Sequence, residues 1–372
     1  MPSRWIRKAG ALAAIALVSW VGAASAQIDR PADVGALAAG AIGTGLGAAG
    51  DGDPAAPSSV DAAIDGLIAS IPVGAGPADV AVSPDGARLY VAHTSADTVS
   101  VVDLATRAVV ATVAVDDQPV ALAISPDGTR LYVAHSSTGL LTTLDTSTDT
   151  VAATLDVGAS AMDVAVSPDG TRIYAALGSG GVAVVEAAGN RLLETVPTGG
   201  FASRVVVSPD GQRVYVAVQG PRPMGPEMRH PRDRVGVIDA LANTLDASVE
   251  IGRVPGAVSA LAVSPDGARV YAGVDHEYLS VIDTSALAEI SRSLVVASPT
   301  ALAVSPDGTR LYVTSRMRGP VLVISTSGGR TAYINVAART WSVAVSPDGA
   351  RAYVVPLEAD VVMVFDTARL TP

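Results

Sequence analysis

The sequence predicts an all-β fold, a seven-bladed β-propeller of four-stranded antiparallel blades. The first observation is a motif, Ser-Pro-Asp-Gly-Xaa-Arg-hydrophobic-Tyr, that occurs seven times. The second is its spacing, because successive copies start 42, 42, 41, 56, 41 and 41 residues apart. The third is that the apolar runs are only four to eight residues long and β-branched, with Gly and Pro between them. A period of about 40 residues built from short strands is typical of propeller blades and disfavours a helical repeat such as HEAT.

Each Ser-Pro-Asp-Gly segment predicts a hairpin turn between the first two strands of a blade. Proline presets the backbone at the second turn position, aspartate suits the third, and glycine accepts the left-handed conformation. The flanking apolar runs are nearly continuous, which favours strands covered on both faces, so we expect the motif tyrosines to pack between blades. The copies run from Ser83, Ser125, Ser167, Ser208, Ser264, Ser305 and Ser346 to Tyr90, Tyr132, Tyr174, Tyr215, Tyr271, Tyr312 and Tyr353.

The repeat begins and ends with parts of a blade. A third strand such as 98–103 and a fourth such as 108–115 follow the first two in a complete repeat. Residues 67–73 align with a fourth strand, whereas the chain ends after three strands of the last repeat. We predict that residues 67–73 complete the seventh blade and close the ring, which removes two exposed sheet edges. The propeller then occupies residues 59–372.

Residues 1–58 are expected to lie outside the propeller. Arg4, Arg7 and Lys8 precede an apolar stretch, and small residues at 24–26 offer a cleavage site, so residues 1–26 are interpreted as a secretory signal peptide. An uncleaved membrane anchor is the alternative. Residues 27–58, rich in Ala, Gly and Pro, indicate a flexible linker. The run at 45–50 has the glycine spacing of a dinucleotide-binding loop, but this linker offers no strand before it and no helix after it.

Composition narrows the classes of partner. Without the three cations of residues 1–26 the chain carries 22 basic and 36 acidic residues, a net charge of −14, which disfavours nucleic acid and anionic membranes. The chain has no cysteine, which excludes a lipoprotein anchor, disulfides, cysteine-ligated metals and covalently attached c-type haem. We expect a monomer that is secreted, periplasmic or exposed at the cell surface.

The repeated Ser-Pro-Asp-Gly-Xaa-Arg-Xaa-Tyr-Val motif resembles that of the YVTN family of bacterial and archaeal β-propeller repeat proteins. The resemblance covers residues 59–372, although no copy carries the final asparagine of the family's tetrad; the first reads Tyr90-Val91-Ala92-His93. It implies a secreted, periplasmic or surface propeller that commonly serves as a binding or surface-layer component. Related propellers include lactonase-like enzymes and the haem d1 domain of nitrite reductases, so the fold alone does not identify a reaction.

We expect the functional face to be the one where the blades differ. The Ser-Pro-Asp-Gly turns are nearly identical and indicate architecture, whereas the second turn of each blade and the links between blades vary. Positions at the entry to the innermost strands should lie near the channel mouth, with carboxylates and histidines in the early blades and arginines in the later ones. An anionic small molecule would suit the arginine side, and a solvated loop surface is the alternative. The candidate ligand-binding residues are Asp79, His93, His135, Asp163, Arg204, Arg229, Arg253, His276, Arg316, Arg318 and Trp341.

Two further features leave alternatives open. The 56-residue step places about 15 extra residues, including the proline-rich segment 219–231, in the second turn of blade four. This insertion could cover the channel mouth as a lid, contact a partner, or have no function. His93 and His135 occupy equivalent positions in neighbouring blades, and a metal site formed by them with Asp79 or Asp163 is an alternative. No local ligand spacing or Gly-Xaa-Ser-Xaa-Gly elbow supports metal or serine catalysis, so no metal, cofactor or catalytic residue is assigned.

These observations favour a secreted, noncatalytic binding or scaffold propeller that recognises a small anionic molecule or an envelope protein on its variable face. The alternative is a propeller enzyme, a lactonase-like hydrolase or cofactor-dependent oxidoreductase, with its site at the channel mouth. A structural cell-surface protein is a third interpretation.

Overall fold

The protein is described by a computed structural model that covers residues 66–220, 233–251, 257–275, 278–295, 298–328, 331–336 and 338–370. The chain divides into two units, Met1–Ala62 and Ala63–Pro372, and the fold below is that of the second. The expected signal peptide, the linker and most of the proline-rich insertion lie outside the described residues. Within the described part no helix is long and apolar enough to cross a membrane.

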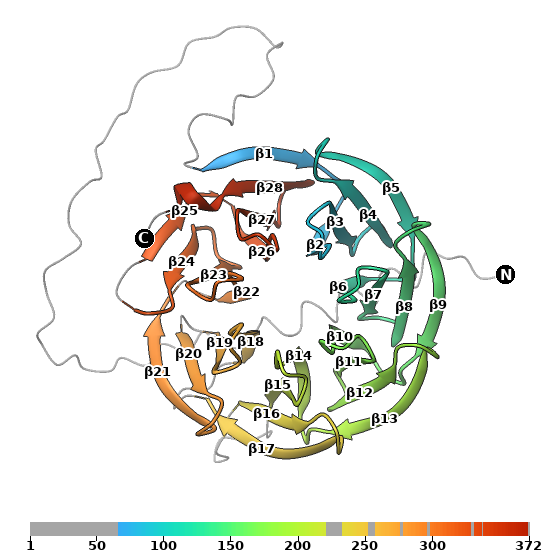
Figure 1. Cartoon of the computed structure of the whole chain (residues 1–372), viewed down its shortest axis with the longest axis vertical. Coiled ribbons are helices and arrows are strands. Elements are labelled where there is room, and N and C mark those ends of the chain that lie inside the picture. Colours follow the sequence, from blue (N-terminus) through green and yellow to red (C-terminus); the bar gives the residue numbers. More distant parts are fainter. Residues whose placement is uncertain are drawn as a thin grey trace, which may run out of the picture. The chain divides into compact units, whose positions relative to one another are not determined.

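The described residues form seven four-stranded antiparallel sheets around a central channel, which confirms the predicted seven-bladed propeller (Figure 1). In blades 1–6 the strands follow one another outward from the channel in chain order. Blades 1–3 consist of β2 (Pro77–Val82), β3 (Arg88–His93), β4 (Thr98–Asp103), β5 (Ala108–Ala114); β6 (Pro119–Ile124), β7 (Arg130–His135), β8 (Leu140–Asp145), β9 (Thr150–Asp156); and β10 (Ala161–Val166), β11 (Arg172–Leu177), β12 (Gly181–Glu186), β13 (Arg191–Pro197).

Blades 4–6 repeat this order. They consist of β14 (Phe201–Val207), β15 (Arg213–Gln219), β16 (Arg234–Asp239), β17 (Thr244–Glu250); β18 (Val258–Val263), β19 (Arg269–Val274), β20 (Tyr278–Asp283), β21 (Ala288–Leu294); and β22 (Pro299–Val304), β23 (Arg310–Ser315), β24 (Val321–Ser325), β25 (Thr331–Ile334).

The seventh blade is assembled from both ends of the propeller. It contains β26 (Thr340–Val345), β27 (Arg351–Pro356) and β28 (Val361–Asp366), followed by the short 3-10 helix η1 (Thr367–Arg369). Its outermost strand is β1 (Leu67–Pro72), which pairs antiparallel with β28 and places Ser70 opposite Met363 (Figure 1). The predicted closure by the N-terminal strand is therefore confirmed.

The hydrophobic core lies between the blades. The described residues form seven clusters of buried side chains, and each contains one motif tyrosine packed against the next blade. Tyr132 of blade 2, for example, packs with Val164 and Ile173 of blade 3. All seven tyrosines are at most 3% exposed, as expected from the nearly continuous apolar strands.

The motif turns also connect neighbouring blades. In the first copy the Ser83 hydroxyl donates to Asp85 Oδ1 (2.5 Å) and accepts the Arg88 N–H (2.8 Å), which fixes the hairpin. The Arg88 side chain then reaches blade 2, where Nη1 donates to the Thr146 carbonyl (2.8 Å) and to Asp149 Oδ1 (3.0 Å). The motif arginines Arg172, Arg213, Arg269 and Arg310 likewise donate to carbonyl groups of the following blade.

Candidate functional site

The channel wall is shaped by an irregularity in every innermost strand. Each first strand shifts its register against the second strand near its start, between Pro77 and Asp79 in blade 1 and between Ala161 and Asp163 in blade 3. Such a bulge redirects side chains and leaves backbone groups outside the ladder. The same place in the seven blades, called the channel position below, holds Asp79, Ala121, Asp163, Arg204, Ala260, Ala301 and Ser342.

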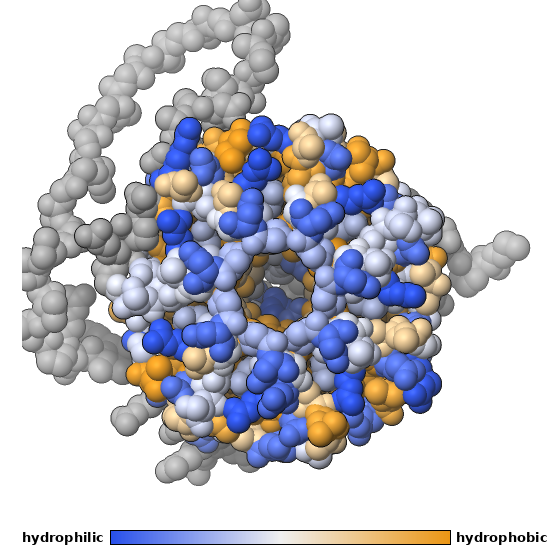
Figure 2. Space-filling view, viewed as in Figure 1, coloured by the Kyte–Doolittle hydropathy of each residue, from blue (hydrophilic) through white to orange (hydrophobic). Residues whose placement is uncertain are grey.

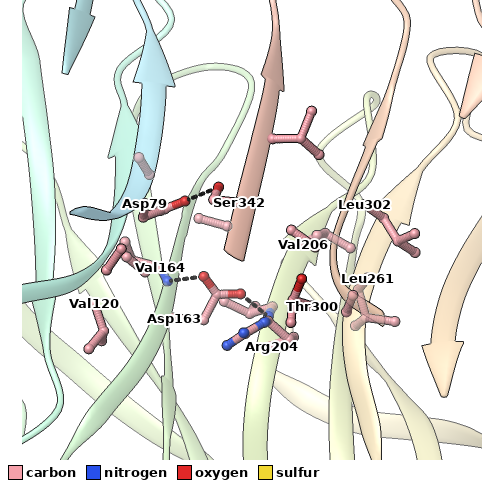
Figure 3. A pocket seen from close by; sticks show the side chains of 18 of the residues that line it. Asp79, Val120, Asp163, Val164, Arg204, Val206, Leu261, Thr300, Leu302 and Ser342 are labelled. Atoms are coloured by element: carbon pink, nitrogen blue, oxygen red, sulfur yellow. Dashed lines mark hydrogen bonds between the residues drawn. The ribbon is translucent and has the colours of Figure 1, made fainter. Parts of the chain in front are cut away.

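All seven channel positions line one cavity of about 360 Å³ in the channel (Figure 3). Figure 2 shows the ring from one end, with a hollow at its centre and a weakly hydrophilic rim. Besides Asp79, Asp163 and Arg204, the lining consists of apolar and hydroxyl side chains, including Trp341 and Thr300. The expectation that the channel positions lie together at the channel is confirmed, and two carboxylates and one guanidinium carry the charge of the cavity wall.

Asp163 of blade 3 bridges two blades with its carboxylate. Its Oδ1 accepts the backbone N–H of Val164 in its own strand (3.0 Å), and its Oδ2 accepts that of Val205 in β14 of blade 4 (2.9 Å; Figure 3). The innermost strand of each blade is a sheet edge, so its N–H groups that face the channel need acceptors from elsewhere. Asp163 supplies them for both strands.

Asp79 of blade 1 connects its blade to both neighbouring blades. Its Oδ2 accepts the backbone N–H of Leu122 in blade 2 (2.8 Å), and its Oδ1 accepts the hydroxyl of Ser342 in blade 7 (2.7 Å; Figure 3). Both aspartate carboxylates therefore already hold neighbouring inner strands together.

Arg204 of blade 4 is partnered differently. Its Nη1 donates to the carbonyl of Ser203 (3.0 Å), and this is the hydrogen bond that its guanidinium makes within the described residues. A guanidinium has five N–H donors, so most of its donor capacity remains for a bound molecule. The Arg204 charge also favours the ionised forms of Asp79 and Asp163, although burial outweighs it in both.

Burial sets the ionisation of the two aspartates. It raises the pKa of Asp163 to about 6, and it raises the pKa of Asp79 from the usual 3.8 against the hydrogen bonds from Ser342 and Leu122. The negative charge of Asp79 adds to the effect on Asp163. The cavity therefore loses negative charge as the pH falls toward 6.

The two histidines are not in the cavity wall. His93 and His135 end β3 and β7, and both are 0% exposed, so neither ring is at the surface where a candidate ligand-binding residue was expected. His93 Nε2 lies 2.9 Å from Ser100 Oγ, and His135 Nε2 lies 3.0 Å from Thr142 Oγ1. Burial lowers the pKa of both rings, which keeps them neutral. Among the described residues, no group of three or more His, Asp and Glu side chains is placed to hold a metal ion.

Arg316, Arg318 and Trp341 lie together between blades 6 and 7. The Arg316 guanidinium stands 5.5 Å from the centre of the Trp341 ring, a cation–π contact, and Trp341 also lines the cavity. Arg318 pairs with Glu358 (2.5 Å), which also pairs with Arg339 (3.1 Å). Three arginines and one glutamate therefore lie beside blades 6 and 7, and the charge of this group is net positive. Arg229, Arg253 and His276 lie outside the described residues.

Sequence reasoning missed the backbone part of the site. The N–H groups of Leu122 and Val205, which bind the two aspartates, carry no side-chain signal. Ser100 and Thr142 were missed as histidine partners, although each stands two residues inside a third strand and is a polar residue in an apolar run. That pattern was the available signal for buried hydrogen bonds.

The fold and the cavity at its centre define a β-propeller protein. A model of the family described as "Lactonase, 7-bladed beta-propeller" matches residues 59–161, a range that contains β1 and all strands of blades 1 and 2. No curated protein matches the chain.

Solved structures share the fold at low identity. The chain is similar to hydrazine synthase of Kuenenia stuttgartiensis, with a TM-score of 0.71, 21% identity and coverage of 82% of this chain and 99% of that chain. It is also similar to the β-propeller domain of Cps50 (Swd1) of Myceliophteria thermophila, with a TM-score of 0.69, 14% identity and coverage of 81% and 99%. At these identities the likeness concerns the fold alone.

Proposed function

We propose that the protein is a secreted, noncatalytic binding propeller of the YVTN type that holds a small anionic molecule in its channel cavity at Arg204. The observation that carries the proposal is the contrast between the charged groups of the cavity. The oxygens of Asp79 and Asp163 accept hydrogen bonds from their own and neighbouring blades, whereas Arg204 bonds only the carbonyl of Ser203 within the described residues. The free side-chain donors in the wall are therefore those of a cation, and an anion complements them.

The size and shape of the cavity agree with a small ligand. A volume of about 360 Å³ is within the range of small-molecule sites, and its wall combines apolar side chains with a few polar groups. Arg316, which stacks on Trp341, and the group formed by Arg318, Arg339 and their shared partner Glu358 add net positive charge beside blades 6 and 7. They would attract an anion toward the channel despite the acidic net charge of the chain.

A thermal-shift screen of small carboxylates, phosphates and sulfates tests the proposal. We expect a subset of these anions to raise the melting temperature and neutral analogues to have no effect. Arg204→Gln should abolish the shift, whereas Arg191→Gln, which changes an exposed arginine on the outer strand β13, should retain it. An unchanged shift in Arg204→Gln would disprove the assignment of this site.

A lactonase-like hydrolase is the second candidate, and two observations favour it. The lactonase family model matches residues 59–161, and burial raises the pKa of Asp163 to about 6, a value suited to a general base near neutral pH. Hydrolysis of small sugar lactones by the purified protein, lost in Asp163→Asn, would support this candidate. Activity that is equal in Asp163→Asn and the unaltered protein would exclude Asp163 as the base.

The location of the protein belongs to the same proposal. Residues 1–26 would direct the chain out of the cytoplasm and be removed, which leaves a periplasmic, extracellular or surface-exposed propeller. An envelope protein that binds the variable face is the alternative partner. Mass spectrometry of the exported protein would find Gln27 as the first residue, and fractionation would identify the compartment.

A further inference from the structure

The inner strands of blades 6 and 7 direct backbone N–H groups into the channel. In blade 6 the Ser305 N–H donates to the Arg310 carbonyl (2.8 Å), so this is a hydrogen-bonded pair of the two strands. Such pairs alternate with unbonded pairs along an antiparallel ladder, and Leu302 lies opposite Val313 three steps away. The Leu302 N–H therefore points away from β23. In blade 7 the hydrogen-bonded pair is Ser346 and Arg351. Val343, three residues before Ser346 and opposite Val354, therefore also points its N–H away from β27.

In blades 2 and 4 the N–H groups at the positions equivalent to Leu302 and Val343 bind carboxylates. Leu122 and Val205 occupy the equivalent places in blades 2 and 4, and each N–H is bound by an aspartate carboxylate of the preceding blade, at 2.8 and 2.9 Å. The Asp163 carboxylate binds two such groups, because one oxygen accepts the N–H of Val164 in its own strand and the other accepts the N–H of Val205 in the next blade. One planar carboxylate thus satisfies two adjacent blades.

Blade 6 lacks that carboxylate. Its channel position holds Ala301, whose side chain cannot accept a hydrogen bond. Neither the Leu302 N–H nor the Val343 N–H has a side-chain acceptor in the described part of the chain. Ala301 is only partly buried and lines the cavity, so the space in front of it is open to a ligand. Ala260, at the same position in blade 5, is 1% exposed and leaves less room.

The geometry points to a carboxylate as the anion bound in the cavity, with its two oxygens on the backbone N–H groups of Leu302 and Val343. The ligand then takes the place that the Asp163 side chain fills between blades 3 and 4. Trp341, which also lines the cavity, offers an aromatic surface to an apolar or ring-shaped remainder of the ligand. This inference rests on the proposed anion-binding function, in which Arg204 supplies the positive charge of the same cavity, and it adds the class of ligand and its anchoring groups.

Two matched substitutions test the anchoring groups without any ligand. Ala301→Asp supplies a carboxylate that can accept hydrogen bonds from the N–H groups of Leu302 and Val343, so the melting temperature at pH 8 should stay the same or rise. Ala121→Asp introduces the same charge at the channel position of blade 2, where Asp79 already binds Leu122 and Asp163 already binds Val164. That variant should melt lower, by about 3 °C or more, because its carboxylate finds no free N–H group. Equal melting of the two variants, or a lower value for Ala301→Asp, would overturn the inference.

Calorimetric titration with benzoate, benzamide and phenyl phosphate then tests the class of ligand. Benzoate should bind the unaltered protein, and benzamide should bind about tenfold more weakly or not at all, since it lacks the charge-assisted hydrogen bonds. Ala301→Asp should weaken benzoate binding by about tenfold or more because its own carboxylate occupies the site. Binding of phenyl phosphate without benzoate would preserve the proposed function and overturn the carboxylate inference. Binding of neither probe, with no anion active in the thermal-shift screen, would overturn the proposed function.

Discussion

The hydroxyl of Ser342 donates a hydrogen bond of 2.7 Å to Asp79 Oδ1, although the two residues lie 263 positions apart in the chain. This bond joins the innermost strands of blades 7 and 1 at the channel. The pairing of β1 with β28 makes a second connection at the outer edge of the same blade. The ring is therefore closed at two radii, by a side-chain bond inside and by a strand ladder outside.

Removing β1 should open the ring. A chain that begins at Gly76 lacks the strand that pairs with β28 and loses Ile71, which is 1% exposed in the core between blades 7 and 1. We expect this chain to lose cooperative thermal unfolding, because one sheet edge and one hydrophobic face become exposed. A chain that begins at Ala63 keeps β1 and serves as the control in calorimetry. Equal melting of the two chains would show that β1 does not hold the ring closed.

The motif tyrosines should contribute more to stability than the motif turns. Tyr132 is 1% exposed and packs against blade 3, so Tyr132→Ala should lower the free energy of unfolding by about 3–5 kcal/mol. Asp127 in the adjacent turn accepts hydrogen bonds from Ser125 and Thr129 at an exposed site, so Asp127→Ala should cost about 1 kcal/mol. Urea denaturation of the two variants measures the difference. A turn variant less stable than the tyrosine variant would contradict the inter-blade role of Tyr132.

The fold could be predicted from the sequence because one motif encodes the same local structure seven times. Each copy supplies a turn, a buried tyrosine and a strand boundary, so the blade number follows from counting. The closure by β1 could also be predicted, since a fourth-strand pattern before the first motif matches the strand missing at the end.

The site could be predicted only in part. Asp79, Asp163 and Arg204 lie at the channel as expected, because the register of the repeat identifies the channel position, and the neighbouring candidate Trp341 also lines the cavity. The burial of His93 could not be predicted, since whether the end of a second strand is covered depends on the link from the preceding blade. In the fold, Gly74 of that link lies directly over the ring, and an added side chain at Gly74 would come within 3.3 Å of it. The hydrogen bonds from the aspartate carboxylates to backbone N–H groups of the next blade could not be predicted either. They depend on how far neighbouring inner strands are shifted along the channel, which the sequence does not encode locally.

The buried histidines should make the propeller less stable in acid. Burial lowers the pKa of His93 and His135 below the usual 6.5, so below that pH the unfolded chain binds more protons than the folded one. Their contribution is complete above pH 6.5 and is lost as the pH falls through 6.5 toward the lower pKa values of the folded rings.

Chemical denaturation between pH 5 and pH 8 measures this dependence. The nearest acidic groups, Asp360 for His93 and Asp116 and Asp117 for His135, oppose the shift only weakly. The double variant His93→Gln, His135→Gln should show a flatter dependence than the unaltered protein, because glutamine retains a hydrogen bond and does not titrate. An unchanged slope in the double variant would show that the histidines do not cause the loss.

Anion binding in the cavity should strengthen as the pH falls from 7.5 to 5. Burial raises the pKa of Asp163 to about 6, so its carboxyl group becomes neutral over this range while benzoate, with a pKa of about 4 like other carboxylic acids, stays ionised. Loss of one negative charge at about 12 Å from the ligand, at an effective dielectric constant of about 20, is worth about 1.4 kcal/mol, a tenfold decrease in Kd. Asp163→Asn keeps an acceptor for one backbone N–H and does not titrate, so calorimetry should find tight binding at both pH values. A pH dependence that is equally steep in Asp163→Asn would assign the effect to another group, of which Asp79, whose pKa burial also raises, is the nearest.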